Sequence, residues 1–123
     1  MKFSFIKLCF LLSGIIFTAQ TAQADTTYNG IRLAATIDVR TPAEFAAGHV
    51  RGAINIPLDR IDAGIQHVRG VAKDSPILLY CRSGVRSAKA NKMLRDQGFS
   101  HVMDGGSLSN LAQTMPTCSE QSC

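Results

Sequence analysis

The feature that most constrains the fold is a continuous run of four apolar residues, Ile77 to Tyr80, between a proline and a cysteine. Such a run is typical of a central strand in a parallel sheet, which other elements cover on both faces. Pro76 marks its beginning, and Cys81 opens a short loop before a helical pattern over Val85 to Gln97. Because parallel strands need crossover connections, the rest of the chain should alternate strands and helices.

The remaining sequence has this alternation. Thr41-Pro42-Ala43-Glu44 predicts a capped helix start, since Thr41 and Glu44 can form a capping box and Pro42 fits the first helical position. Gly48 should end that helix, and Gly105-Gly106 reads as a turn. Further strands are predicted over 34–39, 53–56 and 101–104, and further helices over 59–69 and 108–115. We therefore expect a three-layer α/β domain over 34–115, with a central parallel β-sheet flanked by helices.

The first 24 residues differ in character from the rest of the chain. Lys2 and Lys7 are their only charges, an apolar core runs from Leu8 to Phe17, and Ala22-Gln23-Ala24 offers a small-residue cleavage site. This order predicts a secretory signal peptide, because the apolar run is shorter than the ~20 residues that span a bilayer. We expect cleavage after Ala24, export to a periplasm and no stable membrane anchor afterwards.

Removal of residues 1–24 changes the charge and the apparent hydrophobicity. It leaves 99 of the 123 residues and lowers the net charge from +4 to +2. No basic stripe with aromatic partners remains, so a nucleic-acid partner is not expected. The mature chain should begin with a loose polar leader, 25–33, and end with a cysteine-containing tail, 116–123.

Cys81 stands where ligands bind in sheets of this kind, at the carboxyl end of a central strand. The loop Cys81-Arg82-Ser83-Gly84-Val85-Arg86 leads directly into a helix, whose free N–H groups and dipole favour an anion. Arg82 and Arg86 should add positive charge, and Gly84 permits a tight backbone turn. Since a free cysteine is only ~3% thiolate at neutral pH, these devices together predict an activated nucleophile.

Two long motifs resemble the single-domain rhodanese-like sulfurtransferases. The first runs from Ile37 to Phe45 and continues from Gly48 to Pro57, and the second is the loop from Cys81 to Arg86. Gly98-Phe99 and Gly105-Gly106 are supporting matches, so the resemblance covers about 37–115.

The resemblance implies a thiosulfate sulfurtransferase that works through a persulfide. The Cys81 thiolate would take the outer sulfur of thiosulfate, expel sulfite, and pass the sulfur to cyanide or a thiol. Arg82 and Arg86 would bind the anionic donor, while the loop residues Ser83, Gly84 and Val85 would hold the transferred sulfur. No metal and no organic cofactor is implied, because the cysteine persulfide itself carries the cargo.

The first motif is expected to support the site rather than react. Asp38 and Arg40 should end a strand near the crevice, and Glu44 lies within sequence reach of Arg40 for an ion pair. His49 is expected to bond to backbone, and His67 and His101 to lie on the surface.

Two other functions remain open. A persulfide carrier or binding module serving a protein thiol partner would need the same fold. A cysteine phosphatase of related architecture is disfavoured, because only four residues separate Cys81 from Arg86 and the loop is small for phosphate.

Cys118 and Cys123 end the tail. In an exported protein they can form a local disulfide, which would add little stability unless the tail also docks on the domain. Alternatively, one tail thiol accepts sulfur from Cys81 or protects it as a disulfide.

Overall fold

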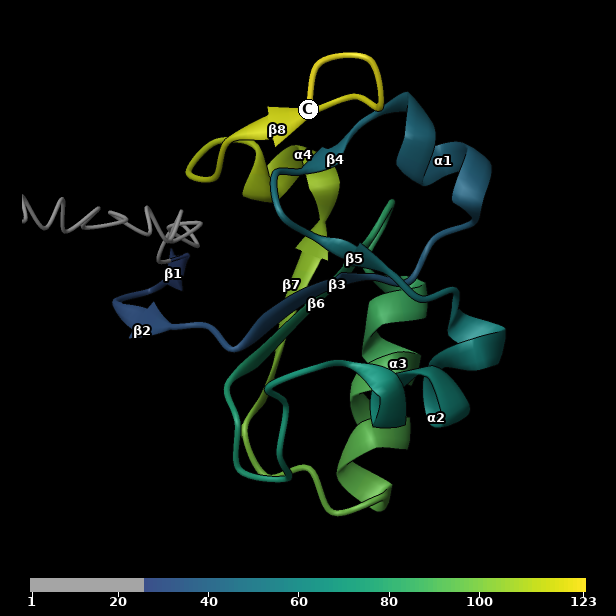
Figure 1. Ribbon diagram of the computed structural model, residues 1–123, viewed down its shortest axis with the longest axis vertical. Coiled ribbons are helices and arrows are strands. Elements are labelled where there is room, and N and C mark those ends of the chain that lie inside the picture. The colour runs from purple at the N-terminus through teal and green to yellow at the C-terminus, as the bar shows by residue number, and fades with distance from the viewer. Residues whose placement is uncertain (1–25) are drawn as a thin grey trace, which may run out of the picture.

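The computed structural model describes residues 26–123, and the expected signal peptide lies outside the described residues. Its centre is a four-stranded sheet in the order β5-β3-β6-β7, in which every neighbouring pair is parallel (Figure 1). The strands are β3 (Ala35–Asp38), β5 (Ile54–Asn55), β6 (Ile77–Cys81) and β7 (Val102–Ser107). The expected α/β fold with a central parallel sheet flanked by helices is confirmed.

Two of the helices follow the sequence prediction closely. Helix α1 (Pro42–Ala47) begins with the expected capping box, in which Thr41 and Glu44 bond to each other's backbone N–H groups. Helix α3 (Val85–Asp96) begins directly after the Cys81 loop. Helix α4 (Leu108–Leu111) is shorter than the predicted 108–115 segment.

The predicted amphipathic helix over 59–69 is wrong as a continuous element. The segment consists of the 3-10 turn η1 (Leu58–Arg60), the short helix α2 (Ile61–Gly64) and the 3-10 turn η2 (Ile65–His67). Arg60, with φ −119° and ψ 3°, interrupts the helical geometry. Apolar residues spaced three or four apart therefore do not require one continuous helix, because a series of short turns can also direct them into the core.

Strand β6 divides the core into two hydrophobic clusters, because successive side chains point to opposite faces of a sheet. Ile77, Leu79 and Cys81 pack with residues of α2 and α3. Leu78 and Tyr80 pack with residues of β4 (His49–Val50) and α4. Figure 1 shows α2 and α3 together at one end of the view, while α1, α4 and β4 gather at the other.

The two ends of the described chain are more ordered than the sequence indicated. The expected loose leader forms a hairpin of β1 (Thr27–Tyr28) and β2 (Ile31–Arg32). The tail contributes β8 (Thr117–Cys118), which pairs antiparallel with β4. The expectation of a loose leader is wrong, and strand β8 was not predicted, because two-residue strands carry too little pattern to be recognised in a sequence.

Gly105-Gly106 also differs from its prediction, because it belongs to β7 rather than to a turn after it. The ladder between β6 and β7 slips at this point, so that three steps along β7 match two along β6. Gly106 has φ +72°, and a side chain at Gly105 would press on Leu78 and Leu111. The glycine pair thus builds a bulge beside the Cys81 end of β6.

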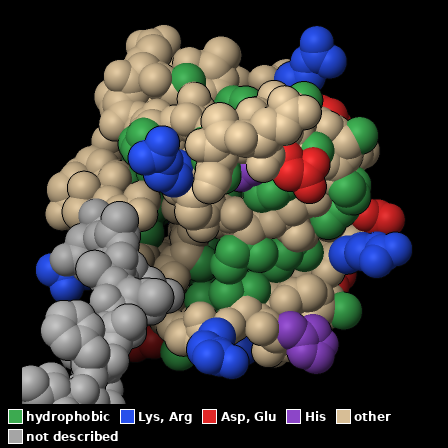
Figure 2. Space-filling view, turned by 45° about the horizontal axis from the view of Figure 1, so that its top comes forward, with side chains coloured by type: hydrophobic (Ala, Val, Ile, Leu, Met, Phe, Trp, Pro, Cys, Tyr) green, Lys and Arg blue, Asp and Glu red, His purple; other side chains and the backbone are tan. Residues whose placement is uncertain are grey.

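No helix within residues 26–123 is long and apolar enough to cross a bilayer. On the face in Figure 2, hydrophobic side chains gather in the middle and basic side chains lie apart from one another around the margin.

Candidate active site

Cys81 is the last residue of β6, and none of its surface is exposed. The sequence predicts that Cys81 opens the loop after the strand, but the residue belongs to the strand and is buried. Strand β6 pairs with β7 for one residue more than predicted, because Cys81 is paired with Ser107. The sulfur therefore lies under the loop of residues 82–87 rather than on it.

Backbone N–H groups of that loop point at the sulfur. Gly84 donates to Sγ of Cys81 at 2.9 Å, and Ser87 donates at 3.4 Å. Gly84 has φ +93°, a left-handed conformation that favours glycine, and a side chain at this position would contact the backbone of Gly106 in the bulge. The turn at Gly84 thus aims two donors at one atom.

Ser87 is a site residue that the sequence motifs do not single out. Its Oγ lies 3.7 Å from Sγ of Cys81 and donates to Oδ1 of Asp104 at 2.7 Å. Asp104 also accepts from Gly106 N–H at 2.9 Å. Ser87 is fully buried, so its hydroxyl belongs to an enclosed network that links the thiol to the bulge of β7. A serine near the start of a predicted helix is the sequence signal, and it is a weak one.

Opposing effects act on the pKa of Cys81. Burial is the largest effect and raises the pKa. The hydrogen bonds of Sγ with the Ser87 N–H and side chain and with the Gly84 and Ser83 N–H groups lower the pKa by more than burial raises it. The net pKa of Cys81 lies below the usual value. The sequence predicts this activation from the helix dipole, the two arginines and N–H groups aimed at the sulfur. In the structure, hydrogen bonds to the sulfur are the main causes that lower the pKa.

The arginines occupy different places. Arg86 forms two hydrogen bonds to Glu44, of 2.7 and 2.9 Å. The expected pairing of Glu44 with Arg40 is therefore wrong, since α1 turns the Glu44 carboxylate toward α3. Arg82 is exposed and lines an open cleft. Ser83 and Val85 are exposed as well, and their side chains make no contact with the sulfur among the interactions described.

Asp38 and Arg40 form a buried pair at the end of β3. The Arg40 Nη2 atom lies 2.6 Å from Asp38 Oδ2 and donates to the carbonyl of Gly48 at 2.6 Å. Asn55 donates to the carbonyls of both Asp38 and Arg40. These bonds fix the end of α1 against β3 and β5, which agrees with a supporting role.

The cleft beside the loop has a volume of about 610 Å³. Both charged side chains and small or apolar ones line it. Its lining includes Arg40, Glu44, Arg82, Ala47, Leu108 and Ala112. The cleft can thus receive an anionic or mixed-polarity molecule next to the loop over Cys81.

The tail cysteines lie elsewhere, on the β4–β8 pair. Cys118 and Cys123 form a disulfide, and Cys81 is the free cysteine of the described chain. His49 bonds through Nδ1 to the carbonyl of Phe45 at 2.7 Å, as expected of a backbone partner. His67 is exposed and His101 partly exposed.

A buried thiol at the carboxyl end of a parallel strand, wrapped by N–H groups at the start of the next helix, defines a thiol-dependent site in an α/β domain. Residues 20–109 match the family described as the rhodanese-like domain, and the chain belongs to that family.

Three relatives illustrate the match. The thiosulfate sulfurtransferase PspE of Escherichia coli is 37% identical over 76 residues, which are 62% of this chain and 72% of that protein. A sulfurtransferase of Allochromatium vinosum is 37% identical over 55% of this chain and 61% of its own length. The uncharacterized protein YqhL of Bacillus subtilis is 42% identical over 59% of this chain and 56% of its own length. The chain thus spans between about half and three quarters of these relatives.

A solved structure agrees. The rhodanese with anions from E. coli superposes with a TM-score of 0.64 and 34% identity, covering 69% of this chain and 96% of that one.

Proposed function

We propose that this protein is a thiosulfate sulfurtransferase that carries sulfane sulfur as a persulfide on Cys81. The observation that carries the proposal is the convergence of the Gly84 and Ser87 N–H groups on Sγ of Cys81. Donors aimed at sulfur stabilise the thiolate that attacks, and they can hold negative charge on a second sulfur bonded to it. The family relationship, which includes a thiosulfate sulfurtransferase, points the same way.

The first half-reaction begins with the Cys81 thiolate. Its lone pair attacks the outer sulfur of thiosulfate, a new S–S bond forms, and the old S–S bond breaks with its electron pair leaving on sulfite. Because Cys81 has no exposed surface, the side chains over the thiol must move aside for the donor to enter. Arg82, on the cleft wall, would attract the dianion and its sulfite product.

Arg86 has a different role in this proposal. Its guanidinium is held by Glu44, which lines the cleft, so it steadies the start of α3 and hence the Ser87 N–H. Its charge still acts on the thiol through space, because the Cys81 thiolate contributes to raising the pKa of Arg86.

In the second half-reaction, a nucleophile attacks the outer sulfur of the persulfide and the Cys81 thiolate leaves. Cyanide or a thiol would serve. The apolar side chains Ala47, Leu108 and Ala112 in the cleft favour an organic thiol, including a cysteine of a partner protein, as the acceptor. A persulfide carrier for a protein partner is therefore the second candidate, and it shares the first half-reaction.

A phosphatase would use the thiol differently. It would need an arginine turned into the loop to hold phosphate, whereas Arg86 is engaged by Glu44. No metal or organic cofactor takes part in the proposed cycle.

Mass spectrometry of the protein after thiosulfate treatment tests the proposal. One added sulfur should appear on Cys81 and disappear on addition of cyanide or a thiol. Cys81→Ser should take up no sulfur. Uptake by that variant, or none by the wild-type protein, would contradict the assignment.

Steady-state transfer to cyanide, measured beside transfer to low-molecular-weight and protein thiols, separates enzyme from carrier. We also propose a periplasmic location with cleavage after Ala24. N-terminal sequencing of the protein from the periplasmic fraction should begin at Asp25.

A further inference from the structure

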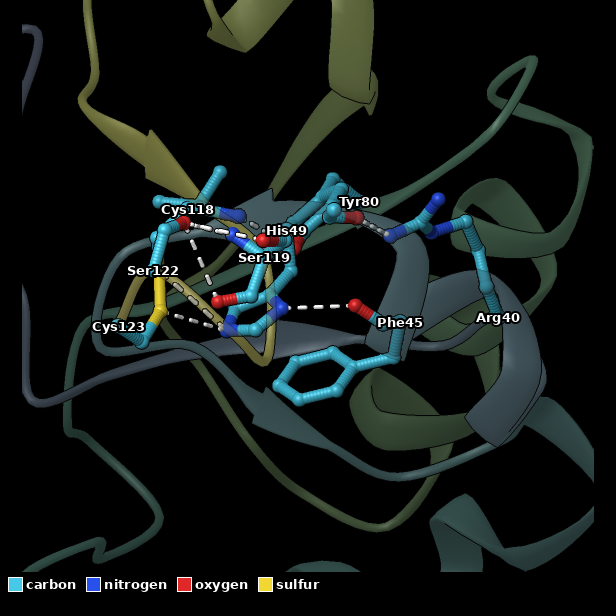
Figure 3. Close-up of a disulfide and its surroundings, with 10 residues drawn as sticks. Arg40, Phe45, His49, Tyr80, Cys118, Ser119, Ser122 and Cys123 are labelled. Carbon is cyan, nitrogen blue, oxygen red and sulfur yellow. Dashed lines mark hydrogen bonds between the residues drawn. A yellow bond between two sulfur atoms is a disulfide. The ribbon is translucent and has the colours of Figure 1, made fainter.

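The β4–β8 pair brings three metal-binding side chains together away from Cys81. The ligand atoms of His49, Cys118 and Cys123 all lie within 4.8 Å of one another. Cys118 and Cys123 form a disulfide, and Nε2 of His49 lies 3.6 Å from the first sulfur and 3.4 Å from the second. Figure 3 shows the His49 ring between the disulfide and Phe45.

The histidine is oriented as a ligand. Its Nδ1 lies 2.7 Å from the carbonyl oxygen of Phe45, and a carbonyl can only accept, so Nδ1 carries the hydrogen. In the neutral ring the lone pair is then on Nε2, the nitrogen that faces both sulfurs. The ring also stacks on Phe45, with centroids 3.7 Å apart. A backbone carbonyl that fixes the tautomer in this way is the usual outer partner of a metal-bound histidine.

The tail is held in place by bonds that do not depend on the disulfide. Strand β8 pairs with β4, Arg51 donates to the Pro116 carbonyl, and Glu120 donates to the Ala46 carbonyl. Cys123 donates its N–H to the Ser119 carbonyl, which closes the turn between the two cysteines. After reduction, both thiols therefore stay beside His49.

The distances suit a tetrahedral cation of the zinc type. With Zn–S of about 2.3 Å and Zn–N of about 2.0–2.1 Å, a sulfur and a nitrogen on the same ion lie about 3.6 Å apart. The observed separations of 3.6 and 3.4 Å match this value. Only the two sulfurs must separate, to about 3.8 Å, which the tetrahedral geometry sets. Their Cα atoms, 5.3 Å apart, can remain where they are.

We propose that the reduced tail and His49 form a Cys2His site for a zinc-type divalent cation, and that the disulfide closes this site. A dithiol reductant opens it: two electrons break the S–S bond, two protons move to the cysteine sulfurs, and the dithiol becomes a disulfide. The cation then displaces both thiol protons and binds two thiolates and Nε2, with a water in the fourth position. The site does not include Cys81, but His49 also lines the cleft proposed for the sulfur donor.

Cobalt(II) binding tests the proposal, because its absorption reports thiolate ligation and tetrahedral geometry. The full chain carrying Cys9→Ser and Cys81→Ser, without a histidine tag, retains only the tail thiols. After anaerobic reduction and removal of the dithiol, it should bind one Co²⁺ per chain with thiolate-to-metal absorption, and Zn²⁺ should displace the cobalt. The air-oxidised protein should bind none. Absence of uptake by the reduced protein, or equal uptake by the oxidised one, would overturn the site.

Matched variants identify the ligands. In the same background, His49→Gln should lower cobalt affinity more than tenfold, whereas His67→Gln, at an exposed histidine, should leave it unchanged. Cys123→Ser changes an exposed residue and should abolish the thiolate absorption of a two-sulfur site. Circular dichroism establishes that each variant is folded. If His49→Gln does not fold, Cys123→Ser decides, and undiminished uptake by that variant would refute the proposal.

Discussion

Glu44 and Arg86, 42 residues apart in the sequence, meet through two parallel hydrogen bonds between the first helix and the helix that follows Cys81. This bidentate contact joins the two motifs of the sequence. It also pairs Arg86, one of the two loop arginines, with a carboxylate. Substitution of Arg86 and substitution of Arg82 should therefore have different effects.

Replacement of Glu44 by Gln should reduce stability in a pH-dependent way. The contact with Arg86 lowers the pKa of Glu44 from 4.5 to about 2. Because the pKa is lower in the folded protein, the carboxylate stabilises the fold at any pH above the pKa of Glu44 in the unfolded chain. This stabilisation is lost as the pH falls through the folded pKa of about 2. Because both side chains are about a third exposed, the effect should stay below about 1 kcal/mol. Urea unfolding at pH 7 and pH 2 should show the wild-type advantage only at pH 7.

Replacement of Ser87 by Ala should raise the pKa of Cys81, because it removes the hydroxyl beside the sulfur while keeping the N–H. An ordinary hydrogen bond contributes about 0.5–1.5 kcal/mol, so sulfur transfer at neutral pH should fall about 2- to 10-fold. Activity should recover at alkaline pH, since more thiolate then forms. Ser83→Ala keeps its N–H and is the control. Ultraviolet titration of the thiolate measures both variants, and equal curves for the two would contradict the assigned role.

Replacement of Arg82 by Ala should weaken binding of the anionic donor. Loss of one charge-assisted contact predicts a rise in KM for thiosulfate of about tenfold or more, with a smaller change in kcat. The exposed Arg69 offers a matched control for the loss of one positive charge. Arg86→Ala should instead lower kcat, because it releases Glu44 and loosens the start of α3. Steady-state kinetics with thiosulfate separates the two patterns, and identical effects of both substitutions would speak against the division of roles.

Replacement of Gly84 by Ala should reduce both stability and activity. Gly84 has φ +93° and Gly98, at the end of α3, has φ +94°, so an alanine meets the same backbone strain of about 1–2 kcal/mol at either position. Only the strain at Gly84 moves an N–H away from Cys81. Thermal unfolding should therefore show similar losses for the two variants, while persulfide formation fails at Gly84→Ala alone. Full activity of Gly84→Ala would show that its N–H contact is dispensable.

The elements that the sequence predicts well are those with a strong local signal. The apolar run ending at Tyr80 and the capping box at Thr41 and Glu44 determine their elements almost by themselves. The apolar run also places Cys81 at the carboxyl end of a central strand. It could not show that the sulfur is covered, because burial depends on how the loop folds back.

The features that escaped prediction are contacts between distant segments. The pairing of Glu44 with Arg86 depends on the angle of α1, and Arg40 is taken by Asp38 two residues before it. The docking of the tail requires His49 and Cys118 to pair across 69 residues. The role of Ser87 depends on Asp104, which arrives from another strand. None of these contacts leaves a periodic pattern in the sequence.

The alternation along β6 has a consequence for redesign of this protein. Leu78 and Tyr80 face the side with the tail, whereas Ile77, Leu79 and Cys81 face α2 and α3. A redesign can therefore repack the first side to reshape the neighbourhood of the cleft while leaving the neighbours of the reactive sulfur untouched. One strand of five residues thus separates two hydrophobic clusters, and each cluster can be redesigned without changing the other.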